Sequence, residues 1–219
     1  MDLYGHIDAR LRQIGMFLRG GFHPEPDEGL RAATVMLIGN AGTAVWPAFT
    51  AAGPPAGPDP FDRWTETVVS AVAEAVGARA VFPFGGPPYQ PFMQWAKRAD
   101  AIHSAPFGLL IHPDYGLWHA YRGALLFDRH QDLPPRDDRP SPCETCADKP
   151  CLSACPVGAL APGHYDVPAC KDHIASVAGR DCLEEGCRAR RACPIGREYH
   201  YDPDQARLHM RAFLGRDPD

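Results

Sequence analysis

The sequence predicts an α+β protein with a mixed N-terminal domain over residues 1–135 and a cysteine-rich C-terminal domain over residues 136–219. Three observations lead to this prediction. All eight cysteines lie after residue 142. Before them, short apolar runs alternate with stretches of helical periodicity. Residues 131–142, QDLPPRDDRPSP, are charged and rich in proline, which is typical of a linker, so the domain boundary is placed there.

Composition restricts the class of protein. The chain has 219 residues, 45% of them hydrophobic, which is enough for a buried core. Its net charge of −5 argues against nucleic-acid binding by bulk charge. No apolar run approaches the length of about 18 residues that a membrane span needs. The opening MDLYGHIDARLRQ is polar and is no secretion signal, so we expect a cytoplasmic protein.

The first elements follow from apolar spacing. Residues 3–18 have the periodicity of a helix, ended by Gly20-Gly21. Residues 32–38, AATVMLI, predict a buried strand, and residues 44–52 a short helix. The turn between them, Gly39 to Gly42, matches neither glycine-rich phosphate-binding pattern, so a plain turn is favoured over a cofactor phosphate site.

The next elements continue this alternation. An amphipathic helix is predicted over residues 61–76, a strand over 78–82 and a helix over 90–98. The loop PFGGPPY at residues 83–89 fits either the wall of a pocket or a turn that caps the core.

A hairpin is predicted around the turn PDYG, with residues 108–112 as one strand and residues 117–127 as its partner. His112 and His119 flank this turn, where they are either acid–base or ligand groups or merely structural. A closing helix is predicted over residues 205–214, with Leu208 and Phe213 as its buried residues.

The cysteines are the strongest signal in the chain. The run PCETCADKPCLSACP has the spacing C-x2-C-x4-C-x3-C-P, and Pro194 follows the last cysteine of the second group as well. Bacterial ferredoxins carry C-x2-C-x2-C-x3-C-P, in which the fourth cysteine binds the other cluster. The eight cysteines are Cys143, Cys146, Cys151, Cys155, Cys170, Cys182, Cys187 and Cys193.

Three chemistries compete for these thiols. The two Cys-Pro endings favour iron–sulfur clusters. Structural zinc needs four sulfur or nitrogen ligands but no proline after the last of them. Disulfides are least favoured, because cytosolic thiols stay reduced.

Under the exchange rule, two 4Fe-4S clusters would divide the cysteines into interleaved sets. Cys143, Cys146 and Cys151 would bind the first cluster, completed by Cys193. Cys170, Cys182 and Cys187 would bind the second, completed by Cys155. The irregular spacing of the second group leaves open whether its cluster holds four irons or three.

The segment from Cys143 to Gly158, the single Cys170, and the phrase GLLIHPDYGLWHAYRGALL resemble the corrinoid iron–sulfur family of epoxyqueuosine reductases and reductive dehalogenases. The resemblance implies a two-cluster ferredoxin-like domain after a reduced nitroreductase-like domain that could bind a corrinoid or flavin. The family's catalytic acid has no matching motif here. Asp62 is the nearest candidate, and its position fits a helix N-cap better.

These observations predict an iron–sulfur electron-transfer protein that exchanges electrons with a redox partner protein or a small-molecule acceptor. The first alternative is a small corrinoid- or flavin-dependent reductase, an oxidoreductase whose clusters feed an N-terminal site. The weaker alternative is a zinc-stabilised interaction protein. Charged and imidazole groups beside the cysteines could tune a cluster or dock a donor, or could form a solvated surface. They are His164, His173, His200, Arg188, Arg190, Arg191 and Arg197.

Overall fold

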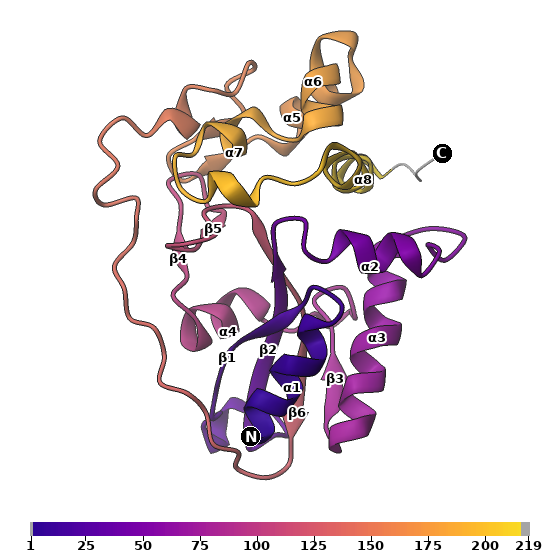
Figure 1. The fold of residues 1–219 in the computed structure, drawn as a ribbon. Coiled ribbons are helices and arrows are strands. Elements are labelled where there is room, and N and C mark those ends of the chain that lie inside the picture. Colours follow the sequence, from indigo (N-terminus) through magenta and orange to yellow (C-terminus); the bar gives the residue numbers. More distant parts are fainter. Residues whose placement is uncertain (1, 216–219) are drawn as a thin grey trace. The chain divides into compact units, whose positions relative to one another are not determined.

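A computed structural model describes residues 2–215 as a mixed α/β structure with small sheets (Figure 1). The chain divides into two compact units. Unit 1 takes the described residues up to Ala101 and then Ala120–Asp138, and unit 2 takes Ile102–His119 and the described residues from Arg139 on. The boundary predicted at residues 135 and 136 lies close to Arg139, where the chain enters unit 2 for the second time, but it leaves residues 102–119 in the N-terminal part.

A four-stranded sheet organises unit 1, with the strand order β1-β2-β6-β3 (Figure 1). The strands are β1 (Phe17–Phe22), β2 (Thr34–Ala41), β3 (Arg79–Val81) and β6 (His119–Phe127). Strand β1 pairs antiparallel with β2, and β3 pairs antiparallel with β6. All of β2 is buried, as its continuous apolar run predicts.

Helices cover this sheet. Helix α1 (Leu3–Arg12) packs on β1 and on α3 (Pro60–Val76), while α4 (Phe92–Ala99) packs on β1 and β2. The helices α3, α4 and the short α2 (Trp46–Ala51) confirm the sequence predictions for these segments. In α3, Trp64, Val69 and Val72 are buried, as its amphipathic pattern indicates.

The first predicted helix was too long. Helix α1 ends at Arg12, Gly15 turns the chain with φ +72°, and Leu18 and Gly20 belong to β1. Ile7 and Leu11 are the fully buried residues of the helix. The apolar spacing continued past Arg12 because Leu18 serves the same core from a strand instead of from the helix.

Unit 2 has two small two-stranded sheets, β4 with β5 and β7 with β8. Their bounds are β4 (His103–Ser104), β5 (Leu110–Ile111), β7 (Leu160–Ala161) and β8 (His164–Tyr165). The predicted hairpin between residues 108–112 and 117–127 was wrong, because β5 pairs with β4 and β6 joins the sheet of unit 1. The run Ala124–Phe127 is buried, and a two-residue β5 could not cover it.

The helices of unit 2 are short. They are α5 (Val167–Ala175), α6 (Arg180–Glu185), α7 (Arg188–Ala192) and α8 (Pro203–Leu214), with the 3-10 turns η2 (Pro150–Leu152), η3 (Val177–Gly179) and η4 (Arg197–Tyr199). The closing helix α8 was predicted, but its buried residues are Gln205 and Ala206. Leu208 and Phe213 are only half-buried, because α8 packs mainly on the small helix α6.

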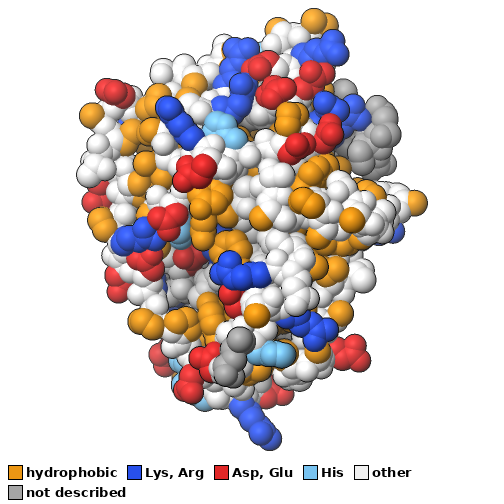
Figure 2. Space-filling model, in the orientation of Figure 1, with side chains coloured by type: hydrophobic (Ala, Val, Ile, Leu, Met, Phe, Trp, Pro, Cys, Tyr) orange, Lys and Arg blue, Asp and Glu red, His pale blue; other side chains and the backbone are white. Residues whose placement is uncertain are grey.

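The surface carries charge of both signs. Figure 2 shows Lys and Arg side chains interspersed with Asp and Glu on the visible face. Within residues 2–215, no helix has both the length and the apolar character needed to cross a membrane.

Candidate metal centres

The first cysteine set lies around a single pocket in unit 2. Cys143, Cys146, Cys151 and Cys193 line it, and its empty volume is about 360 Å³ including space open to solvent. Its other walls are apolar or proline side chains and one cation. They are Ala105, Pro106, Phe107, Ile111, Leu117, Pro142, Lys149, Pro150, Pro194 and Ile195. A pocket lined by four thiols and apolar groups has the donor chemistry of an iron–sulfur site.

Local backbone structure brings these four thiols together. Lys149 adopts a left-handed conformation with φ 39° and begins η2, which carries Cys151. Cys193 is the C-cap residue of α7, and α7 packs on η2. Two short elements separated by about 40 residues of chain therefore face one another across the pocket.

The electrostatics of the first set shows that its sulfurs lie within range of one another. Burial raises the pKa of Cys143 above its ordinary value, and the thiolates of Cys193 and Cys146 raise it further. Burial also raises the pKa of Cys151, with added repulsion from the other three sulfurs of the set. Binding cations would relieve this repulsion, because a metal ion stabilises the thiolate form.

The second set consists of Cys155, Cys170, Cys182 and Cys187. Burial raises the pKa of Cys170, and repulsion from the other three thiolates of the set raises it further. Cys170 lies on α5, Cys182 on α6, and Cys187 is the N-cap residue of α7. Three of these sulfurs have hydrogen-bond donors: the backbone N–H of Ala159 donates to Cys155 at 3.3 Å, the Tyr165 hydroxyl donates to Cys170 at 3.4 Å, and the backbone N–H of Arg188 donates to Cys182.

The two sets are interleaved along the chain. Cys187 and Cys193 bound the same short helix α7 but belong to different sets. Cys151 and Cys155 likewise lie on either side of the end of η2 and belong to different sets. Two-cluster ferredoxins divide their cysteines between clusters in an interleaved order of this kind.

The donor chemistry of the two sets bears on the choice of metal. Each set offers four cysteine sulfurs, and none of them is in a disulfide. A 4Fe-4S cluster takes four cysteine thiolates, and tetrahedral zinc also accepts four sulfurs. The residues of both sets therefore fit a 4Fe-4S cluster, and the Cys-Pro endings at Pro156 and Pro194 favour it over zinc.

Tyr165 is the site residue that the sequence did not single out. It lies five positions before Cys170, separated from it by the cap of α5, and its hydroxyl reaches the sulfur. Burial, followed by the hydrogen bond to Cys170, raises the pKa of this phenol. No sequence motif relates a tyrosine to a cysteine five residues later, so only the folded structure reveals the contact.

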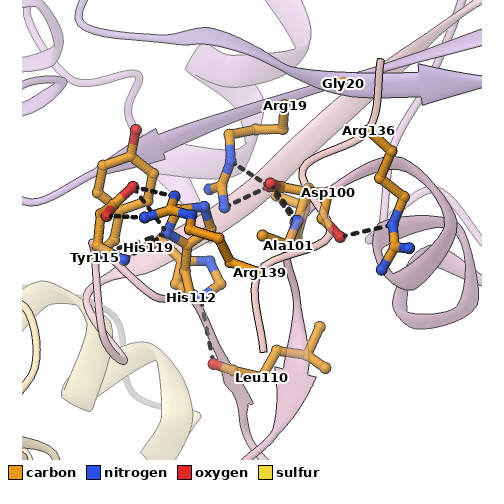
Figure 3. A network of polar contacts seen from close by, with 12 residues as sticks. Arg19, Gly20, Asp100, Ala101, Leu110, His112, Tyr115, His119, Arg136 and Arg139 are labelled. Atoms are coloured by element: carbon orange, nitrogen blue, oxygen red, sulfur yellow. Dashed lines mark hydrogen bonds and ion pairs between the residues drawn. The ribbon is translucent and has the colours of Figure 1, made fainter. Parts of the chain in front are cut away.

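The two histidines at the turn have structural partners. Nδ1 of His112 accepts the backbone N–H groups of Asp114 and Tyr115 at 3.0 and 3.3 Å. Nε2 of His119 lies 3.2 Å from the carbonyl oxygen of Leu110 (Figure 3). Asp114 also accepts both Nη groups of Arg139 at 2.7 Å. These contacts hold the turn at residues 112–116 in place.

The arginines and histidines near the cysteines have mostly structural contacts. Arg188 and Arg191 both donate to Asp181 beside the second set. Arg190 donates to the carbonyl of Leu117 at 2.6 Å, with its guanidinium 4.5 Å from the centroid of the Trp118 ring. The remaining flagged residues lie at the surface or partly buried: His164 and Arg197 are exposed, while His173 and His200 are half-buried.

Asp62 is not the N-cap residue that the sequence suggested. Asp59 occupies the N-cap of α3, and Asp62 lies in the first turn. Its Oδ1 accepts a hydrogen bond from Arg122 at 2.5 Å, and Arg122 also lies over the ring of Phe61. The ion pair and this hydrogen bond hold Asp62 against Arg122 within unit 1.

Comparison with solved structures finds similar folds among epoxyqueuosine reductases. The chain is similar to epoxyqueuosine reductase from Streptococcus thermophilus, with a TM-score of 0.56 and 16% identity over 94% of this chain and 70% of that one. It is similar to the Bacillus subtilis enzyme whose aspartate-bearing catalytic loop is swung out of the active site, with a TM-score of 0.52, 16% identity, and coverage of 93% and 70%.

A third similar structure is an epoxyqueuosine reductase bound to an epoxyqueuosine-modified tRNA stem loop, with a TM-score of 0.53, 15% identity, and coverage of 93% and 70%. No protein-family model matches the sequence, and no curated protein does. At these identities the likeness establishes a shared fold, which extends over both units of the chain.

Proposed function

We propose that this chain is an iron–sulfur oxidoreductase component that holds two 4Fe-4S clusters in a ferredoxin-like C-terminal part, residues 136–219. The observation that carries the proposal is the division of all eight cysteines into two interleaved sets of four, with mutual repulsion among the thiolates of each set. Bound there, the clusters would supply one-electron transfer. The shared fold with epoxyqueuosine reductases supports a redox role.

The residues of the chain have distinct roles in this proposal. Cys143, Cys146, Cys151 and Cys193 hold the first cluster, and Cys155, Cys170, Cys182 and Cys187 hold the second. Phe107, Ile111 and Leu117 keep water away from the first set. The helix α7, with one cysteine of each set at its two ends, fixes the separation between the sets. We place the protein in the cytoplasm, where thiols stay reduced, with a redox protein or small molecule as its electron partner.

A second candidate is a small reductase in which the N-terminal part, residues 1–135, has a nitroreductase-like fold and binds a corrinoid or flavin. One observation favours it: the likeness to the reductases covers 94% of this chain and so includes unit 1. Asp62, the nearest sequence candidate for the catalytic acid of such a site, is paired with Arg122, and we assign no proton donor. The tRNA stem loop in a similar structure suggests RNA as a substrate class, while the net charge of −5 offers no bulk attraction for it.

The test is an absorption spectrum with iron and sulfide counts, on protein purified without air. We expect a broad absorption band at about 400 nm that bleaches with dithionite, and about eight irons per chain. Zinc with no visible band would contradict the proposal and favour a structural cysteine domain. About four irons would contradict the two-cluster assignment. A tightly bound corrinoid or flavin would favour the reductase over the simple carrier.

A further inference from the structure

The hydroxyl of Tyr165 is directed at one sulfur of the second set. It donates a hydrogen bond to Sγ of Cys170 at 3.4 Å. A phenol is protonated at neutral pH, so toward a thiolate it can act only as a donor. The donors to two other sulfurs of the set are backbone groups, the N–H of Ala159 for Cys155 and that of Arg188 for Cys182.

Several contacts fix the position of this hydroxyl. Tyr165 pairs with the buried Leu160 in the β7–β8 hairpin. Its ring is stacked on that of Phe213 in α8, with centroids 6.3 Å apart and planes 9° from parallel. Asp166 follows at once and caps α5 by accepting the N–H of Ala169 at 3.0 Å. The hydroxyl and the sulfur are therefore held by one rigid connection of strand, cap and helix.

We propose that Tyr165 is a positioning residue that raises the reduction potential of the second cluster through its hydrogen bond to Cys170. This inference rests on the two-cluster function proposed above. Reduction adds one electron to the cluster and makes its thiolate ligands more negative, so a donor to sulfur binds the reduced form more strongly. The O–H bond stays intact: the electron comes from the external reductant, and the proton remains on Tyr165.

The first set offers a matched control. Ser141 precedes Cys143, and its hydroxyl accepts the backbone N–H of Cys143 at 3.3 Å. Ser141→Ala and Tyr165→Phe each remove one hydroxyl beside one cysteine set. Only the second change should affect the second cluster.

The experiment is a potentiometric titration followed by electron paramagnetic resonance, on protein with a full iron count. The Cys143→Ala protein should keep only the second cluster, so its titration shows which midpoint potential belongs to that cluster. We expect Tyr165→Phe to lower the midpoint potential of the second cluster. The one-electron equilibrium constant should change by up to tenfold, which corresponds to about 59 mV. Ser141→Ala should leave it unchanged.

A second variant keeps the test decisive if Tyr165→Phe binds less iron. Replacing Tyr165 by 3-fluorotyrosine keeps the ring and makes the hydroxyl a stronger donor, so the second midpoint should rise above that of the wild type. An unchanged midpoint in a fully loaded Tyr165→Phe protein, or no rise with fluorotyrosine, would overturn the inference alone. Wild-type protein without two clusters would overturn the proposed function and this inference with it.

Discussion

Arg19 donates a hydrogen bond from Nε to Oδ2 of Asp100 at 2.7 Å, and its Nη2 lies 2.7 Å from the same oxygen (Figure 3). Both side chains are almost wholly inside unit 1, with 1% and 11% of their surfaces exposed. The hydroxyl of Tyr121 donates to the same carboxylate oxygen at 2.8 Å. This buried pair ties β1 to the end of α4.

Asp100→Asn should therefore destabilise the protein strongly. The change leaves the Arg19 charge buried without its counter-charge, which costs about 3–5 kcal/mol in the free energy of unfolding. Urea unfolding followed by circular dichroism measures this difference. Asp138→Asn is the control. The Asp138 side chain, which pairs with Arg136, is 76% exposed, so its substitution should cost less than about 1 kcal/mol in the free energy of unfolding. Equal costs for the two variants would contradict the prediction.

Gly116→Ala should disturb the first cysteine set. Gly116 has φ +55°, and a Cβ there would lie 2.0 Å from the carbonyl oxygen of Ile195, which follows Cys193 closely and lines the same pocket. We expect a loss of more than about 2 kcal/mol in unfolding free energy, and a lower iron content.

Gly163→Ala is the matched control for this strain. Gly163 also has a positive φ, +70°, but open space surrounds its Cβ position. Its substitution should cost about 1 kcal/mol and leave the iron count unchanged. If Gly116→Ala cost no more than Gly163→Ala, the close packing of the two loops would be disproved.

Double cysteine variants test the interleaving of the two sets. Cys155 belongs to the first run in sequence but is proposed to bind the second cluster, so Cys155→Ala with Cys170→Ala should keep about four irons in the first cluster. Cys143→Ala with Cys155→Ala should remove both clusters. Retention of four irons by this second pair would show that the cysteines follow sequence order instead.

His200 should make stability depend on pH. Burial lowers the pKa of this imidazole, and Arg191, Arg197 and Arg190 lower it further. At a pH between the lowered pKa of the folded state and the ordinary unfolded pKa of about 6.5, the unfolded chain binds more protons than the folded chain. The contribution of His200 to stability is therefore fully present above about pH 6.5 and is lost as the pH falls below 6.5.

The measurement is the urea midpoint between pH 7.5 and pH 5. His200→Phe keeps a ring against Trp118, whose centroid is 4.4 Å from that of His200, and should flatten the dependence on pH. The same change at the exposed His164 should leave the slope as it is. A slope that persists in His200→Phe would rule out this residue as its source.

Local patterns predicted the helices of unit 1 well, except for the end of α1, because the information lies within a few residues. The assignment of the cysteines to two sites stays a prediction. The apolar stripe of residues 61–76 is sufficient to define α3. Strand pairing was predicted less well: β6 joins β2 and β3, which are distant in sequence, and no turn signal near residue 113 encodes that choice. The contact between Tyr165 and Cys170 depends on the cap of α5 and on packing from α8, so spacing alone could not reveal it.

The passage of residues 102–119 into unit 2 and back has a consequence for synthesis on the ribosome. Leu117 and Ile111 emerge early, but they help to line a pocket whose last cysteine, Cys193, is made much later. If the first set binds a cluster as proposed, that cluster could not be enclosed until nearly the whole polypeptide has been translated. A gene fragment that starts at residue 136 would encode every thiol and still lack five residues that line that pocket, Ala105, Pro106, Phe107, Ile111 and Leu117.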